Sequence, residues 1–154
     1  MTENEEILNG ANSYAKKRST CAKVHVGSVI VTKQGEYIYG CNHGVMNCVE
    51  NGCRRVRLYG ENSKIHRLPS DCDALHSEVD AICKAAGRGV RLEGATIYIT
   101  RYPCEACARA IAASGIRKVI YGRNEDISEY TGVILADAGV EIEKVNWVEE
   151  DNNA

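Results

Sequence analysis

Hydrophobic and polar residues follow helical spacing in some segments of this chain and form short apolar runs in others. Apolar residues at helical spacing predict helices over residues 5–17 and 75–86. Pro103 suits the first turn of a third helix running to Ala113 and a Gly115 cap, and residues 131–138 form a fourth. Runs rich in β-branched and aromatic residues predict strands at 27–31, 37–39, 95–100, 116–121 and 140–145.

The order of these elements predicts the fold class. The turn Lys33-Gln34-Gly35 should join the first two strands in a hairpin. Strands that alternate with helices indicate an α/β domain, in which helices cover a mixed or largely parallel sheet. There is no internal repeat, low-complexity segment or linker, so residues 1–154 are expected to form a single domain.

Residues 40–75 are the least regular part of the chain. They contain Cys41, Cys48, Cys53 and Cys72, several Gly and Asn residues, and little periodic hydrophobicity. A loop of this length is unusual inside a compact domain unless it is functional or held in place. We predict that a metal ion holds it.

Composition indicates the cellular compartment of the protein and excludes some classes of binding partner. The formal net charge is −2 and no basic cluster occurs, which argues against nucleic-acid binding. No apolar run could span a bilayer, and the acidic N-terminus lacks the features of a signal peptide, so a cytoplasmic protein without a membrane partner is expected. In that compartment eight cysteines favour metal binding over disulfides. Cys83, inside a predicted helix, is interpreted as a small buried hydrophobic residue.

The strongest chemical signal lies between His76 and Cys107. The chain has His76-Ser77-Glu78 followed by Pro103-Cys104-Glu105-Ala106-Cys107, and this H-x-E…P-C-x-x-C pattern is the signature of zinc deaminases. The two cysteines are three apart at a helix start, so they share a face and lie near the positive helix end that favours thiolates.

Together with His76 they make three zinc ligands, which leave a fourth position for water. Glu78 can move a proton of that water. A redox pair or a closed structural zinc site is the alternative, but a structural site has no use for the carboxylate.

Further segments resemble the deoxycytidylate (dCMP) deaminase family over roughly residues 14–145. They are Arg18-Ser19-Thr20-Cys21, Val26-Gly27-Ser28-Val29-Ile30-Val31, Gly40-Cys41-Asn42, His76 to Ile82, Leu92 to Tyr98, Thr100 to Cys104 and Gly115 to Tyr121. The resemblance implies a three-layer cytidine-deaminase-like fold, with a five-stranded mixed sheet and helices on both faces. It also implies conversion of dCMP to dUMP with catalytic Zn²⁺, activation by dCTP, inhibition by dTTP, Mg²⁺ accompanying a nucleotide effector, and a homohexamer.

The resemblance and the predicted elements together suggest substrate contacts. Asn42 is the candidate for the sugar or phosphate, although the family usually has Gly-Tyr-Asn-Gly where this chain has Gly-Cys-Asn-His. The backbone N–H of Ser77 is the candidate for the base carbonyl. Tyr102 either borders the base or packs, and Arg123 either binds phosphate or is a solvated loop residue. Val26 and Thr100 complete the predicted contacts.

A second, structural zinc is implied by some members of the same family. Its ligands would be Cys21, Cys48 and Cys72, with Cys53 or His66 as the fourth. Four N/S ligands form a closed tetrahedral site, which would explain the irregular loop. Scattered free cysteines are the alternative.

Two other functions remain open from the sequence. One is a deaminase that acts on a free nucleoside, a nucleobase or a tRNA base. The other is a non-enzymatic, zinc-stabilised binding module, against which Glu78 argues.

Overall fold

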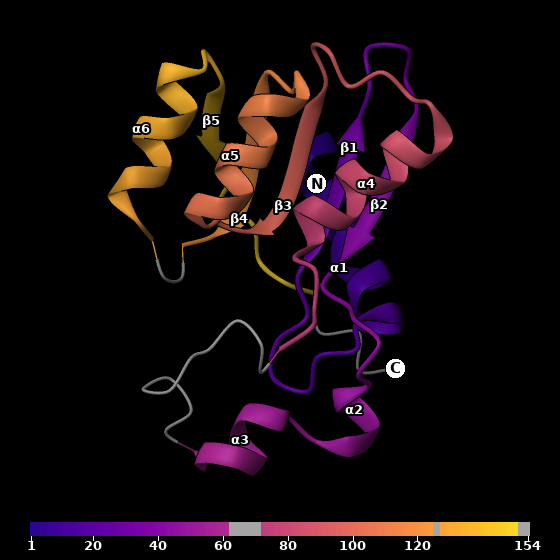
Figure 1. The fold of residues 1–154 in the computed structure, drawn as a ribbon. Helices are drawn as coiled ribbons and strands as arrows, with labels where there is room; N and C mark the ends of the chain where they lie inside the picture. Colours follow the sequence, from indigo (N-terminus) through magenta and orange to yellow (C-terminus); the bar gives the residue numbers. More distant parts are fainter. Residues whose placement is uncertain (62–71, 125–126, 151–154) are drawn as a thin grey trace.

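The computed structural model describes residues 1–61, 72–124 and 127–150, and Figure 1 shows their arrangement. The larger helices are α1 (Glu3–Arg18), α4 (Ser77–Arg88), α5 (Glu105–Ser114) and α6 (Glu129–Asp137). The strands are β1 (Gly27–Val31), β2 (Tyr37–Cys41), β3 (Thr96–Arg101), β4 (Lys118–Arg123) and β5 (Glu141–Lys144).

The five strands form one mixed sheet in the order β2-β1-β3-β4-β5. β1 is antiparallel to both of its neighbours, and β3, β4 and β5 run parallel. The predicted hairpin is confirmed, with Val31 opposite Tyr37. Figure 1 shows α4, α5 and α6 in front of the sheet and α1 behind it. The expected three-layer α/β fold is therefore confirmed.

Each face of the sheet buries its own hydrophobic cluster. In front, Ile97, Ile99 and Val119 of the strands pack with Ala81 of α4 and Ile111 of α5. Behind, the smaller cluster consists of Leu8, Tyr98, Ile120 and Trp147. Consecutive strand residues point to opposite faces, so Tyr98 belongs to the rear cluster while Ile97 and Ile99 belong to the front. The C-terminal segment thus helps α1 to cover the rear face.

The segment predicted to be an irregular loop contains two short helices, α2 (Cys48–Asn51) and α3 (Arg54–Tyr59). Neither contributes a buried residue, and Figure 1 shows both well away from the sheet. Their lack of a buried apolar face explains why hydrophobic periodicity did not predict them. The side chain of Asn47 accepts the Glu50 N–H and caps the first of them.

Two local predictions were wrong. Cys83 is exposed, not buried: the buried residues of α4 include Ala81 and Ala85, and a residue two positions away points about 200° around the helix. Pro103 lies before Cys104, the N-cap of α5, rather than inside the first turn.

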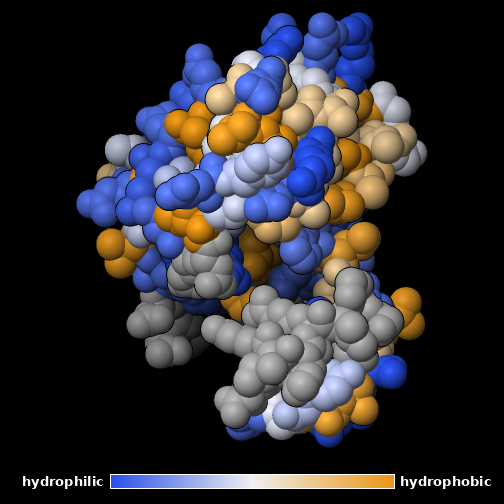
Figure 2. All heavy atoms as spheres, turned by 60° about the vertical axis from the view of Figure 1, so that its left-hand side comes forward, coloured by the Kyte–Doolittle hydropathy of each residue, from blue (hydrophilic) through white to orange (hydrophobic). Residues whose placement is uncertain are grey.

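In the described part of the chain, no helix combines the length and apolar character needed to cross a membrane. Figure 2 brings the α6 side forward and shows hydrophobic residues interspersed with hydrophilic ones.

Candidate active site

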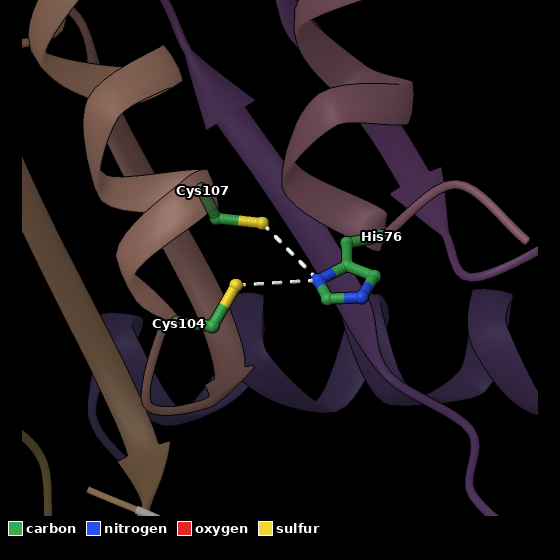
Figure 3. A group of neighbouring side chains, drawn as sticks. All are labelled: His76, Cys104 and Cys107. Carbon is green, nitrogen blue, oxygen red and sulfur yellow. Dashed lines mark hydrogen bonds between the residues drawn. The ribbon is translucent and has the colours of Figure 1, made fainter. Parts of the chain in front are cut away.

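The three predicted ligands lie at the starts of two helices. His76 is the N-cap of α4, Cys104 is the N-cap of α5, and Cys107 is the third residue of α5. An N-cap side chain and the third helical residue lie close together, as in a capping box. Here cysteines occupy both positions, and neither N-cap side chain makes a capping hydrogen bond. Figure 3 shows both sulfurs pointing toward the His76 ring.

The distances within this group suit one ion. His76 Nδ1 lies 3.4 Å from Cys104 Sγ and 3.3 Å from Cys107 Sγ. Zn–N and Zn–S bonds in tetrahedral geometry place nitrogen and sulfur about 3.6 Å apart. The three ligand atoms all lie within 4.8 Å of one another. The donor set and its spacing therefore fit Zn²⁺ with a position left open.

The thiols are electrostatically coupled. The hydrogen bond from Cys107, aided by the one from His76, lowers the pKa of Cys104 to about 3 although burial opposes this. The same hydrogen bond, together with burial and the nearby Glu78, raises the pKa of Cys107. These effects favour a thiolate at Cys104 and a protonated thiol at Cys107. A bound cation would displace the proton that the two sulfurs share.

Glu78 stands beside this group as predicted and is 4% exposed. Its Oε1 accepts a hydrogen bond from Ser77 Oγ, and Ser77 Oγ is also bonded to Ser28 Oγ, both at 2.5 Å. Because Ser77 donates to the carboxylate, Ser28 is the donor of the second bond. A buried chain of two hydroxyls thus holds the carboxylate. Ser28 was not predicted, although a serine within an apolar strand run was a visible signal.

Asn42 is buried, and its side chain is largely occupied. Its Oδ1 accepts the Val26 N–H at 2.9 Å, and Nδ2 donates to the Val24 carbonyl at 2.8 Å. The single hydroxyl hydrogen of Ser19 is shared between Asn42 Oδ1 and the Asn42 backbone carbonyl, each 2.8 Å from Ser19 Oγ. The amide therefore ties the segment before β1 to the end of β2. One Nδ2 hydrogen is left from the amide's usual set for another partner.

The remaining predicted contacts are spread along the ends of β1, β3 and β4. Val26 immediately precedes β1, and Thr100 Oγ1 accepts the Gly27 N–H at 3.1 Å. Tyr102 packs edge-on against Tyr121, with ring centroids 4.9 Å apart. Tyr102 thus has the packing contact that was the alternative to a base contact.

Arg123, at the end of β4, is not a solvated loop residue. Its guanidinium pairs with Glu149 at 3.0 Å and donates to the Thr100 carbonyl at 3.3 Å. It also lies over the Trp147 ring, 5.8 Å from the ring centroid. These contacts hold the C-terminal segment against the sheet.

Asp80 is a buried carboxylate that the sequence reasoning missed. Its oxygens accept the Cys41 N–H at 3.0 Å, His43 Nε2 at 2.8 Å and Lys84 Nζ at 3.0 Å. Burial raises its pKa, but these bonds, with that from His43 largest, hold the pKa of the Asp80 carboxyl below its usual value. A charged residue next to Ala81 on the buried face of α4 was the available signal.

Four of the five residues predicted for a second metal site line the same hollow. Cys21, Cys48, Cys53 and Cys72 line one hollow of about 160 Å³, which none of the three ligands above borders. Burial, then the neighbouring cysteines, raise the pKa of Cys48, although a hydrogen bond with the Arg54 backbone opposes this. Within the described residues, three ligand atoms within 4.8 Å of one another are found at His76 and not here. His66 lies outside the described residues.

Comparison with known proteins places these features in a family context. A family model described as the cytidine and deoxycytidylate deaminase zinc-binding region matches residues 1–123. The deoxycytidylate deaminase of Enterobacteria phage T2 is 40% identical over 105 residues, which is 65% of this chain and 56% of that protein. That of Mycobacterium phage D29 is 36% identical over 123 residues, which is 76% of this chain and 92% of that protein.

Among solved structures, the dCMP deaminase of cyanophage S-TIM5 in complex with dCMP and dUMP has a TM-score of 0.70 and 25% identity. The similarity covers 94% of this chain and 99% of that one. Several curated relatives are considerably longer, and the chain spans between 40% and 64% of their length.

Proposed function

Because this chain belongs to the cytidine and deoxycytidylate deaminase family, we propose that it catalyses the hydrolytic deamination of dCMP to dUMP with release of ammonia. The observation that carries this proposal is a buried carboxylate, Glu78, beside a His/Cys/Cys group with zinc-ligand spacing. The choice of dCMP rests on the relatives from phages T2 and D29, both deoxycytidylate deaminases, and on the S-TIM5 enzyme in complex with dCMP and dUMP.

His76, Cys104 and Cys107 would hold the metal ion. A Zn²⁺ ion bound by them would act as a Lewis acid and lower the pKa of a water molecule toward neutrality. The two cysteines sit at a helix N-terminus, whose positive dipole end stabilises their thiolates.

Glu78 carries the protons in this mechanism. Its carboxylate removes a proton from water as the oxygen attacks C4 of the cytosine, and it delivers that proton to N3. It then transfers the second water proton to the amino group, the C4–N4 bond breaks, and ammonia leaves. The hydrogen bond from Ser77 Oγ restrains the carboxylate between these transfers.

Substrate binding involves the groups around this centre. We propose that the Ser77 backbone N–H binds the base carbonyl and that Val26, Thr100, Asn42, Tyr102 and Arg123 border the nucleotide. Nδ2 of Asn42 donates one hydrogen to the Val24 carbonyl and has a second one for the sugar.

The cysteine hollow is proposed to hold a second, structural zinc ion. Cys21, Cys48, Cys53 and Cys72 border the same hollow, and metal binding needs their sulfurs to draw closer together. Cys21, Cys48 and Cys72, with Cys53 or His66 as the fourth ligand, would give a closed tetrahedral site. The ion would hold α2 and α3 against the segment before His76.

Regulation and assembly follow from the family resemblance alone. We propose activation by dCTP with Mg²⁺, inhibition by dTTP, a homohexamer and a cytoplasmic location. Initial rates with each effector, and the mass in solution by light scattering, test these statements.

One experiment separates the candidate substrates. The purified zinc-loaded protein is incubated with dCMP, CMP, deoxycytidine or a tRNA stem-loop, and the released ammonia is measured. We expect kcat/KM for dCMP to exceed the other values by at least about tenfold, since nucleotide groups bound in the transition state raise this ratio. Ammonia release from the stem-loop alone would assign the chain to RNA editing, and none from any substrate would refute the proposal.

A further inference from the structure

Ser28 places a buried hydroxyl in the apolar strand β1. Its neighbours Val29 and Ile30 are hydrophobic, and Ser28 itself is 0% exposed. A buried hydroxyl costs free energy unless it is hydrogen-bonded, and an alanine would pack at this position without that cost. The Ser28 hydroxyl meets Ser77 Oγ at 2.5 Å. This polar contact between the sheet and α4 is what distinguishes Ser28 from a packing residue.

The sheet fixes the position of this hydroxyl. Ser28 lies between Gly40 of β2 and Ile99 of β3 in the strand register. Ile99 belongs to the front cluster, and residues directly opposite each other share a face of the sheet, so Ser28 faces α4. A Cβ on Gly40 would lie 2.3 Å from the Ser77 carbonyl oxygen, which shows how closely the start of α4 approaches the sheet. Figure 1 shows α4 in front of β1 and β2.

The directions of two hydrogen bonds order the three side chains. The Glu78 carboxylate can only accept, so the single hydrogen of Ser77 Oγ goes to Glu78 Oε1. The Ser77 oxygen then accepts the hydrogen of Ser28. A serine hydroxyl can rotate among several staggered positions, and the donor on its oxygen restricts this choice. Ser28 thus holds the Ser77 hydroxyl in the orientation that reaches the carboxylate.

This arrangement makes the two oxygens of Glu78 unequal. In the proposed mechanism the carboxylate takes a proton from water and delivers protons to the base. The last torsion of a glutamate side chain is soft, so an unrestrained carboxylate would turn away from the geometry that proton transfer needs. The Ser77 bond to Oε1 restrains that torsion and leaves Oε2 for the transfers.

We infer that Ser28 is a positioning residue for Glu78, which acts through Ser77 to fix Oε1 so that Oε2 carries the protons. This inference rests on the proposed deamination of dCMP. Because Ser28 acts on the orientation of the proton carrier, its loss should slow the chemical step and leave substrate binding unchanged.

The test measures kcat and KM for dCMP, together with bound zinc, in three variants. Ser28→Ala should lower kcat about three- to tenfold, the value of one neutral hydrogen bond, with unchanged KM and zinc content. Ser77→Ala removes a hydrogen bond to a charged group but keeps the backbone N–H, so kcat should fall about 10- to 100-fold. The double variant should be no slower than Ser77→Ala, because Ser28 acts only through Ser77.

Thr32→Ala is the matched control at the other end of β1. Thr32 is 4% exposed, and its Oγ1 accepts the Glu36 N–H at 3.0 Å. This variant also loses a buried hydroxyl and its hydrogen bond, but kcat should equal that of the wild type.

Three results would overturn the inference while wild-type turnover of dCMP leaves the proposed function standing. One is an unchanged kcat in Ser28→Ala, and another is a loss confined to KM or to bound zinc. The third is a double variant in which the two losses of kcat multiply, since Ser28 would then act independently of Ser77. A wild type that deaminates no cytosine nucleotide refutes the proposed function, and this inference with it.

Discussion

Gly40 tests how the sheet positions the start of α4, the helix that contains Glu78. An added Cβ at this position would lie 2.3 Å from the Ser77 carbonyl oxygen and 2.8 Å from the Ala81 nitrogen. Both are backbone atoms, so no side chain can rotate to relieve the contact. Gly40→Ala must therefore move the start of α4 away from β2 by about 0.7 Å to reach the closest separation that real Cβ atoms show.

The structure sets the size of the effect. Overpacking in a dense interior costs about 1–3 kcal/mol, and a contact with backbone on both sides belongs at the upper end. We expect the free energy of unfolding to fall by about 3 kcal/mol. Because Ser77 follows His76, the same shift exceeds the tolerance of about 0.2 Å for metal–ligand distances, so zinc affinity should fall as well.

Urea unfolding followed by circular dichroism gives the stability, and competition with a chelator gives the zinc affinity. Gly87→Ala is the matched control within α4: its Cβ would meet nothing within 4 Å, and removing a helical glycine should stabilise by about 0.5–1 kcal/mol. A Gly40→Ala protein within about 0.5 kcal/mol of the wild type, with unchanged zinc affinity, would refute the reasoning.

Three further predictions follow from other parts of the structure. Asp80→Asn should lower the free energy of unfolding by about 2 kcal/mol at pH 7. Since the folded state lowers the pKa of Asp80, the difference in stability between wild type and variant should shrink once the pH falls below about 4. A difference that does not change with pH would contradict this prediction. Trp147→Ala should cost about 3–5 kcal/mol in urea unfolding, because this large side chain is 7% exposed and fills the rear cluster; a cost below about 1 kcal/mol would show that the C-terminal segment does not stabilise the fold. Elemental mass spectrometry should find two zinc ions per chain in the wild type and one in the double variant Cys48→Ser/Cys53→Ser. A wild type with one zinc ion per chain would exclude the structural site.

The sequence predicted the elements that bury apolar surface and the grouping of His76, Cys104 and Cys107, which depends on residue spacing. The run at residues 27–31 coincides with β1, and the predicted ligands His76, Cys104 and Cys107 meet because they lie at the starts of two helices. Periodicity and motif spacing are local properties of the chain, so they can be recognised without the tertiary structure.

Features that depend on long-range contacts were not predicted from the sequence. The Ser28–Ser77 bond joins residues 49 positions apart, and the Asp80 bonds to Cys41 and His43 join β2 and its following loop to α4. Cys83 was misjudged because a small residue in an amphipathic helix gives little information about which face it occupies. Hydrogen-bond partners of buried polar groups follow only from the packing of the elements.

The central claim is that Glu78 transfers protons beside a zinc ion held by His76, Cys104 and Cys107. The most direct test measures bound zinc and ammonia release from dCMP on the same samples of wild type and Glu78→Gln. The glutamine keeps the size of the side chain but cannot take up a proton. We predict equal zinc content and a loss of kcat of about 10²- to 10⁴-fold. A zinc-loaded Glu78→Gln protein that retains more than about a tenth of the wild-type kcat would contradict it.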